Sequence, residues 1–84
     1  MPDPMTVRLV CFSQVRYLMG TDSLLLELPV GATAAAAEDE LRRRLPDHAR
    51  ALQMRIAINQ EFADRSTVLR HGDEVVFLPP MQGG

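Results

Sequence analysis

The residues with the clearest chemical potential are the last two of the chain, Gly83 and Gly84. A terminal carboxylate that follows two glycines has no side chain within two residues of it, so a second enzyme can draw it down a narrow tunnel to ATP. The preceding Pro79 and Pro80 hold the chain extended and reduce the entropy lost on capture. An extended tail beyond Leu78 reaches about 20 Å. A frayed end is the alternative interpretation. The predicted tail, residues 79–84, consists of Pro79, Pro80, Met81, Gln82, Gly83 and Gly84.

Other groups that could carry chemistry are few. Cys11 is the only cysteine, which excludes disulfides and multi-cysteine metal sites, and two histidines cannot build a metal site alone. Cys11 could carry a persulfide, but its alternation with Leu9 favours a small buried apolar residue. No catalytic triad order and no glycine-rich phosphate loop is present. We therefore expect no metal site, no bound cofactor and no catalytic pocket, and we place any chemistry at the Gly84 carboxylate.

Composition limits the partners and the compartment. The 84 residues make one small domain with nine basic residues, all arginine, and 11 acidic residues, for a net charge of −2. This balance gives nucleic-acid binding little electrostatic support. The apolar runs are too short to span a membrane, and the N-terminus lacks the pattern of a signal peptide. We expect a cytoplasmic protein that binds neither nucleic acid nor membranes.

The elements that must position the tail can be predicted from propensity and turn signals. Strands are expected at 6–12, 23–28, 55–59 and 74–78, with a short extension from Phe62 after a bend at 60–61. A short helix at 14–19 is expected between Ser13 as cap and Gly20, and a long helix from about Thr33 to Leu45. Three acid–arginine pairs at i,i+4 are expected along it: Glu38–Arg42, Asp39–Arg43 and Glu40–Arg44. The predicted organisation is a disordered leader at 1–5, a domain at 6–78 and the tail.

One long helix can cover only one face of the predicted sheet, so the fold class is α+β and the other face is open. Alternation places Arg8 and Glu74 on that open face. The apolar residues expected beside them are Val10, Phe12, Val76 and Leu78. If the first and last strands are neighbours, these four residues form one apolar patch, which is typical of a partner site. A further piece of sheet covering the patch is the alternative.

Three segments together resemble the small-subunit family of molybdopterin synthase: residues 7–16, residues 58–62 and residues 72–84. The most specific is the last, which reads Gly-Asp-Glu-Val-Val-Phe-Leu-Pro-Pro-Met-Gln-Gly-Gly. Met81 and Gln82 depart from the family pattern, in which a branched aliphatic and a small residue are usual. The resemblance covers nearly the whole chain from Thr6. It implies a ubiquitin-like β-grasp fold, with a mixed sheet packed on one main helix.

The same resemblance implies a sulfur carrier, which is a non-catalytic, sulfur-donating subunit of the synthase. An E1-like adenylyltransferase would use ATP to adenylate the Gly84 carboxylate, and a sulfur donor enzyme would supply the sulfur that replaces AMP. The resulting thiocarboxylate would donate sulfur to a pterin precursor during molybdenum cofactor biosynthesis. Two carriers would bind a dimer of the large subunit as a heterotetramer. Phe12, Phe62 and Leu78 match the apolar positions that pack on that subunit.

Other functions remain open at this stage. The sulfur carrier of thiamin thiazole synthesis has the same fold and terminus, but it joins its first two strands by a tight turn, whereas residues 13–22 insert a helix here. Carriers for cysteine synthesis also end in two glycines. A ubiquitin-like protein modifier and a non-reactive β-grasp interaction module belong to different classes, and only the second could dispense with the terminal glycines.

Overall fold

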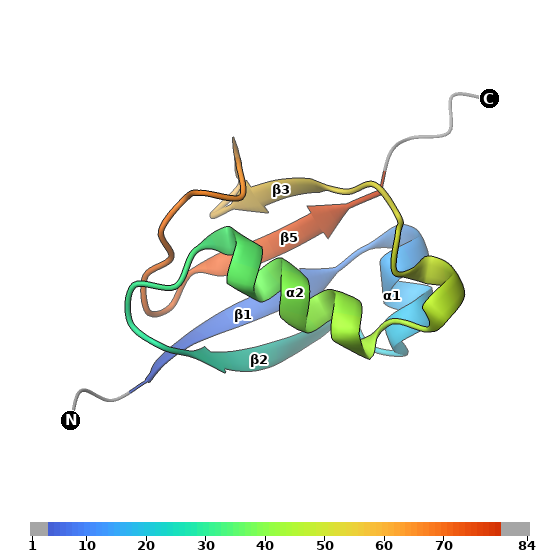
Figure 1. The fold of residues 1–84 in the computed structure, drawn as a ribbon, viewed down its shortest axis with the longest axis horizontal. Coiled ribbons are helices and arrows are strands. Elements are labelled where there is room, and N and C mark those ends of the chain that lie inside the picture. The colour runs from blue at the N-terminus through green and yellow to red at the C-terminus, as the bar shows by residue number, and fades with distance from the viewer. Residues whose placement is uncertain (1–3, 80–84) are drawn as a thin grey trace.

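The computed structural model describes residues 4–79, which form a five-stranded mixed sheet with one long helix across one face (Figure 1). The elements are β1 (Met5–Cys11), α1 (Ser13–Met19), β2 (Ser23–Leu28), α2 (Ala34–Arg44), a 3₁₀ turn (Asp47–Ala49), β3 (Arg55–Ile58), β4 (Glu61–Ala63) and β5 (Glu74–Leu78). The predicted α+β class and the predicted bounds of β2 and β5 are confirmed.

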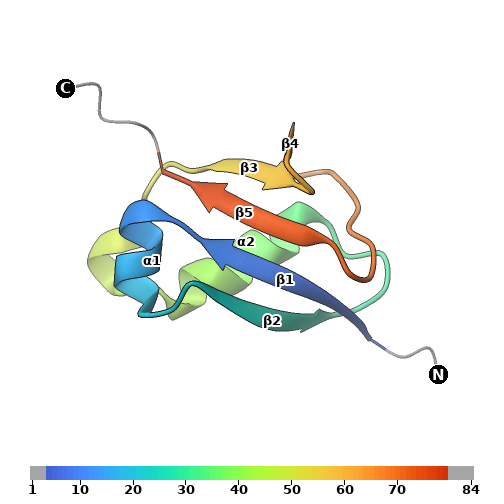
Figure 2. The same ribbon diagram turned by 180° about the vertical axis from the view of Figure 1, so that it is seen from behind.

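The sheet order brings the first and last strands together. The order is β2-β1-β5-β3-β4, and β1 pairs in parallel with β5 while the other neighbours are antiparallel. Because β1 and β5 are parallel, both end at the same edge of the sheet, where α1 follows β1 (Figure 2). The first and last strands are therefore neighbours, as a contiguous apolar patch on the open face requires.

The core lies between the sheet and α2. Val7, Leu9 and Cys11 alternate along β1 toward the helix and are at most 2% exposed, as the alternation predicts. From α2, Ala37 and Leu41 face them with no exposed surface. Alanines on this face let the helix pack closely on the sheet.

The start of α2 shows how the chain compensates for a missing cap. Thr33 occupies the N-cap position, as predicted, but its side chain makes no capping hydrogen bond. Instead the backbone N–H groups of Ala34 and Ala35 donate to the carbonyl oxygens of Thr67 (2.8 Å) and Arg65 (3.0 Å). The loop after β4 therefore satisfies two donors that a helix start leaves free.

The start of α1 corrects one prediction. Ser13 does not cap the helix: it is the first helical residue, with φ +53°, and Phe12 is the N-cap. The Phe12 carbonyl accepts hydrogen bonds from the N–H groups of Val15 (3.0 Å) and Arg16 (3.2 Å), which makes it the first helical acceptor. At the other end Gly20 adopts φ +71° and stops the helix, as predicted.

The predicted strand bounds differ at both ends of β1 and at the β3–β4 hairpin, and β1 ends at Cys11 rather than at residue 12. Met5 is not part of the leader, since it pairs with Leu28 at the start of β1 and is 4% exposed. The hairpin between β3 and β4 turns at Asn59–Gln60, one residue earlier than predicted, because both residues adopt the positive φ (51° and 72°) of a two-residue turn. Residues 1–3 of the predicted leader lie outside the described residues.

The ion pairs along α2 follow the sequence in two cases out of three. Glu38–Arg42 (2.8 Å) and Glu40–Arg44 (2.7 Å) form as predicted. Arg43 pairs with Glu40 instead of Asp39. Asp39 lies 3.9 Å from Arg65 of the loop after β4, so a contact between elements replaces the expected pair within the helix.

Candidate partner-binding face and tail exit

The predicted tail begins where the chain leaves the sheet at the end of β5. Pro79 is half-buried and is the last described residue. The predictions on Pro80, Met81, Gln82, Gly83 and Gly84 fall outside the described residues. What the structure establishes is the exit point: the tail follows Leu78 at the end of β5, beside the end of β1.

The face of the sheet opposite α2 carries a row of apolar residues across four strands. In the strand register Val10 lies beside Val76, Val76 beside Ala57, and Ala57 beside Phe62. Val76 and Ala57 are only 6% and 8% exposed, yet they lie outside the main core cluster of the described residues. Phe62 at the row's end is 63% exposed.

A second row lies at the edge where the tail leaves. Leu78 of β5 pairs in register with Arg55 of β3, and Phe12 follows the last β1–β5 pair with an extended backbone. Phe12 is 48% exposed and Leu78 is half-buried. The Arg55 guanidinium carbon lies 3.9 Å from the centre of the Phe62 ring, which joins the two rows by a cation–π contact. We call these two rows the open-face patch: Val10, Val76, Ala57, Phe62, Phe12, Leu78 and Arg55.

The other end of the open face is charged, as the alternation predicts. Arg8 and Glu74 form an ion pair of 2.6 Å between β1 and β5. Arg55 and Ala57 on this face were not predicted, because the alternation of inward and outward residues was applied only to the first and last strands. The buried Ile56 between them was the signal that both residues face outward. Within residues 4–79 no additional sheet covers the patch, so that alternative is wrong for the described part of the chain.

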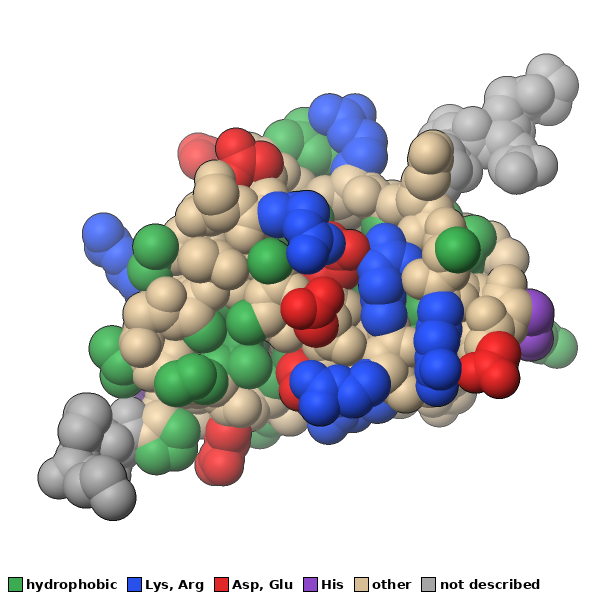
Figure 3. All heavy atoms as spheres, viewed as in Figure 1, with side chains coloured by type: hydrophobic (Ala, Val, Ile, Leu, Met, Phe, Trp, Pro, Cys, Tyr) green, Lys and Arg blue, Asp and Glu red, His purple; other side chains and the backbone are tan. Residues whose placement is uncertain are grey.

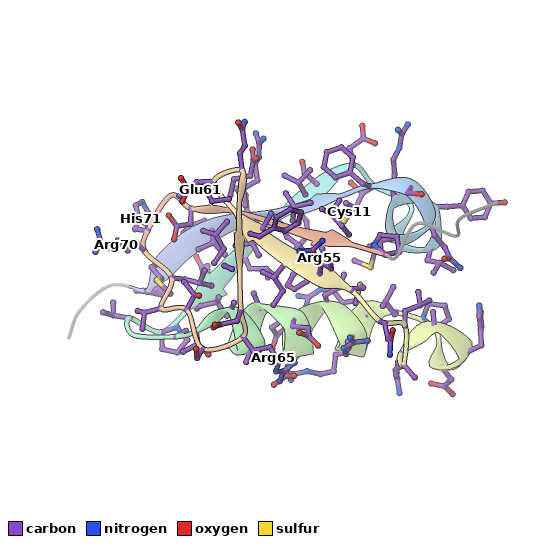
Figure 4. The ribbon with its side chains drawn as sticks, turned by 90° about the horizontal axis from the view of Figure 1, so that it is seen from above. Cys11, Arg55, Glu61, Arg65, Arg70 and His71 are labelled. Carbon is purple, nitrogen blue, oxygen red and sulfur yellow. The ribbon has the colours of Figure 1, made fainter. Side chains whose placement is uncertain are left out.

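The face that carries α2 has a different character. Arginine and acidic side chains alternate over the helix (Figure 3). The Glu38 side chain is only 8% exposed, and its carboxylate forms ion pairs with Arg42 (2.8 Å) and Arg65 (2.6 Å). A groove of about 670 Å³ runs from these residues to Arg55 and Phe62 at the sheet edge. Figure 4 shows Arg65 beside α2 and Arg55 on β3, on the two sides of that edge. Glu38 pairs with both arginines and Asp39 lies 3.9 Å from Arg65, so this side is a solvated face of paired charges.

The remaining candidate groups are structural. Cys11 is 2% exposed, and burial, helped by the negative charge of Asp22, raises the pKa of its thiol. A protonated, buried thiol is a poor nucleophile, which supports the predicted structural role. His71 accepts a hydrogen bond at Nδ1 from the Thr6 N–H (3.0 Å), which fixes the turn before β5 to β1.

Residues 4–79 contain no group of three His, Cys, Asp or Glu side chains that could hold a metal ion. No helix in the same residues is long and apolar enough to cross a membrane.

Comparison with known proteins places this chain in a family. The ThiS family model matches residues 9–84, which include the terminal glycines. The molybdopterin synthase sulfur carrier subunit of Arabidopsis thaliana is 31% identical over 80 residues, covering 93% of this chain and 82% of the relative. The protein of the same name in Haemophilus influenzae is 37% identical over 76 residues, covering 87% and 93%.

Solved structures agree with the fold. A protein described as molybdopterin converting factor, subunit 1, from Pyrococcus furiosus matches with a TM-score of 0.82 and 25% identity, covering 92% of this chain and 99% of that one. Small archaeal modifier protein 1 from Methanosarcina acetivorans matches with a TM-score of 0.79 and 22% identity, covering 99% and 100%. The complex of subunits 1 and 2 of the molybdopterin-converting factor from Helicobacter pylori matches at 0.62 and 20%, covering 95% and 100%.

The mixed five-stranded sheet on one main helix is the ubiquitin-like β-grasp fold, as predicted. The chain belongs to the ThiS family, and its resemblance to molybdopterin synthase small subunits is confirmed by its relatives.

Proposed function

We propose that this chain is the sulfur carrier subunit of a molybdopterin synthase. The observation that carries the proposal is its similarity to sulfur carrier subunits along almost the whole chain, including a family match that runs to Gly84. The helix α1 between β1 and β2 supports this assignment over the thiamin-pathway carrier, which joins the same strands by a tight turn.

The proposed chemistry takes place at the Gly84 carboxylate. A free carboxylate is a poor electrophile, so an E1-like adenylyltransferase first converts it with ATP to the acyl adenylate and releases pyrophosphate. Sulfide-level sulfur (HS⁻) supplied by a donor enzyme then attacks the acyl carbon, the C–O bond to AMP breaks, and AMP and a proton leave, with no change of oxidation state. The thiocarboxylate that remains is a nucleophile that keeps its charge near neutral pH, so the carrier needs no activating base of its own. The absence of a general base near the terminus in the sequence is consistent with this role.

The domain has the second proposed task, which is to deliver that group to a partner. We assign the partner contact to Val10, Phe12, Phe62, Val76 and Leu78 in the open-face patch. The tail leaves the sheet beside Phe12, so a large subunit bound on the patch receives the tail directly. A large-subunit partner is supported by the complex of subunits 1 and 2 among the structural relatives, and the heterotetramer with a large-subunit dimer is proposed from the family resemblance alone.

Mass spectrometry of the endogenous protein tests the proposal. The carrier is expected to carry sulfur in place of one oxygen at its C-terminus, and this fraction should disappear when the activating enzyme is deleted. A ubiquitin-like modifier would instead leave its terminal glycines on lysines of other proteins. Finding such conjugates and no thiocarboxylate would contradict the proposal.

A further inference from the structure

Arg55 is the only charged residue of the open-face patch. Seven of the nine arginines pair with a carboxylate of the chain. Among residues 4–79, no carboxylate pairs with Arg55 or with Arg70, and Arg70 lies in the turn at the charged end of β5. Arg55 thus has no acidic partner among the described residues: it contacts the Phe62 ring, has Leu78 as its register partner, and lines the same groove as Glu38 without an ion pair to it.

The geometry around Arg55 holds its guanidinium in a defined position. The Phe62 ring supports it at 3.9 Å, and Leu78 is its register partner on β5. Stacking on a ring uses one face of the planar guanidinium and leaves its N–H edges free to donate. A flexible lysine could not present the same fixed fork. The side chain therefore offers a prearranged, two-pronged donor beside the tail exit.

This arrangement has a consequence for any protein that binds the patch. A partner surface that covers both Leu78 and Phe62 must also cover Arg55, which is the register partner of Leu78 and lies over the Phe62 ring. Removing an unpaired guanidinium from water is unfavourable and would offset much of the apolar gain. A carboxylate in the partner compensates for that cost by accepting two parallel N–H···O bonds from the guanidinium.

We propose that Arg55, stacked on Phe62, is a specificity-determining residue that selects a partner with a carboxylate side chain embedded in its apolar contact surface. The inference rests on the proposed function, because the partner meant is the large subunit of the synthase. Carriers and large subunits that lack this charge pair would combine poorly, so the pair restricts which large subunit accepts the tail.

Calorimetric titration of the full chain with the purified large subunit of the same organism tests this inference. Arg55→Met keeps the apolar stem and removes only the charge, so circular dichroism should not change. Binding should weaken by about 30-fold or more, because the partner's carboxylate is left buried and unpaired. Arg55→Glu should weaken it further, and Arg55→Lys should recover part of the loss. Arg43→Met, on the exposed side of α2, is the matched control and should bind as the unchanged chain does.

Leu78→Asp in the same assay separates two kinds of failure. If Leu78→Asp binds poorly while Arg55→Met binds as tightly as the unchanged chain or more tightly, the partner has no such carboxylate and this inference is overturned, but the proposed function stands. If Leu78→Asp binds normally with its fold intact, the patch is not the interface, and both the inference and that part of the proposed function are overturned.

Discussion

The Glu38 carboxylate joins two elements that are distant in sequence. It lies on α2 with its side chain 8% exposed, and it bridges Arg42 of the same helix and Arg65 of the loop after β4. The same loop supplies the carbonyl groups that accept from the first N–H groups of α2. One buried carboxylate therefore reinforces the attachment of the β4 edge, which carries Phe62, to the rest of the domain.

Glu38→Ala should destabilise the domain by about 1–3 kcal/mol, because two guanidinium groups lose their shared acceptor in a partly buried site. Glu40→Ala on the same helix is the matched control, since it has the same gain in helix propensity but removes only surface ion pairs. Urea unfolding followed by circular dichroism measures both. An equal loss in the two variants would show that Glu38 has no special structural role.

Cys11 offers a second prediction at the scale of one residue. Burial, with Asp22 nearby, raises the pKa of its thiol, so the thiolate fraction at neutral pH is lower than in the unfolded chain. Alkylation of the native protein should be much slower than alkylation in urea. Cys11→Ala should lose about 1–2 kcal/mol of stability through a small cavity and still transfer sulfur. Loss of transfer in a variant with an intact fold would restore the persulfide hypothesis.

At the scale of elements, local patterns predicted the strands better than the contacts between them. Alternation along β1 and β5 placed Val10 and Val76 correctly, because a strand that buries one face has only one workable register. Met5 was missed because its position in β1 depends on pairing with β2, which the prolines of the N-terminus do not reveal. Arg55 was missed on the open face for a different reason: the alternation of Arg55, Ile56 and Ala57 is present in the sequence, but alternation was applied only to the first and last strands. Its position beside Leu78 depends on the pairing of β3 with β5, and local sequence carries no direct signal of such pairing.

The proposed role of the open-face patch as the contact surface for the large subunit can be tested at Phe12. Phe12→Asp changes a residue that is 48% exposed, so the domain should fold with an unchanged circular dichroism spectrum. Binding to the large subunit should weaken by about 3 kcal/mol, since a charge is then buried at an apolar contact. Tyr17→Asp on α1, where the side chain is 87% exposed, serves as the control and should bind normally. Unchanged binding of the Phe12 variant would show that the patch is not the interface.

At the scale of the whole molecule, binding and chemistry are assigned to different parts of the chain. The sheet presents the patch, and the proposed reactive group lies at the end of a tail whose extended reach from Leu78 is about 20 Å. The parallel pairing of β1 and β5 connects the two parts, because it brings the edge of the patch and the tail exit together. Changes at the terminus should therefore affect transfer without affecting the docking of the domain.

Deletion of Gly84 tests this separation. The terminal carboxylate would move about 3.3 Å back along an extended tail, while the contacts of the sheet stay in place. Reacting atoms must approach within about 3–3.5 Å, and a misplacement near 1 Å already costs about 100-fold, so transfer should collapse. An alanine added after Gly84 should be as damaging, because it moves the carboxylate forward and places a Cβ in the tunnel. The measurement is molybdopterin formation from the precursor with purified large subunit and chemically thiocarboxylated carrier, with binding followed by calorimetry. Lost transfer with retained binding is the expected result, and retained transfer in the shortened chain would overturn the proposed carrier mechanism.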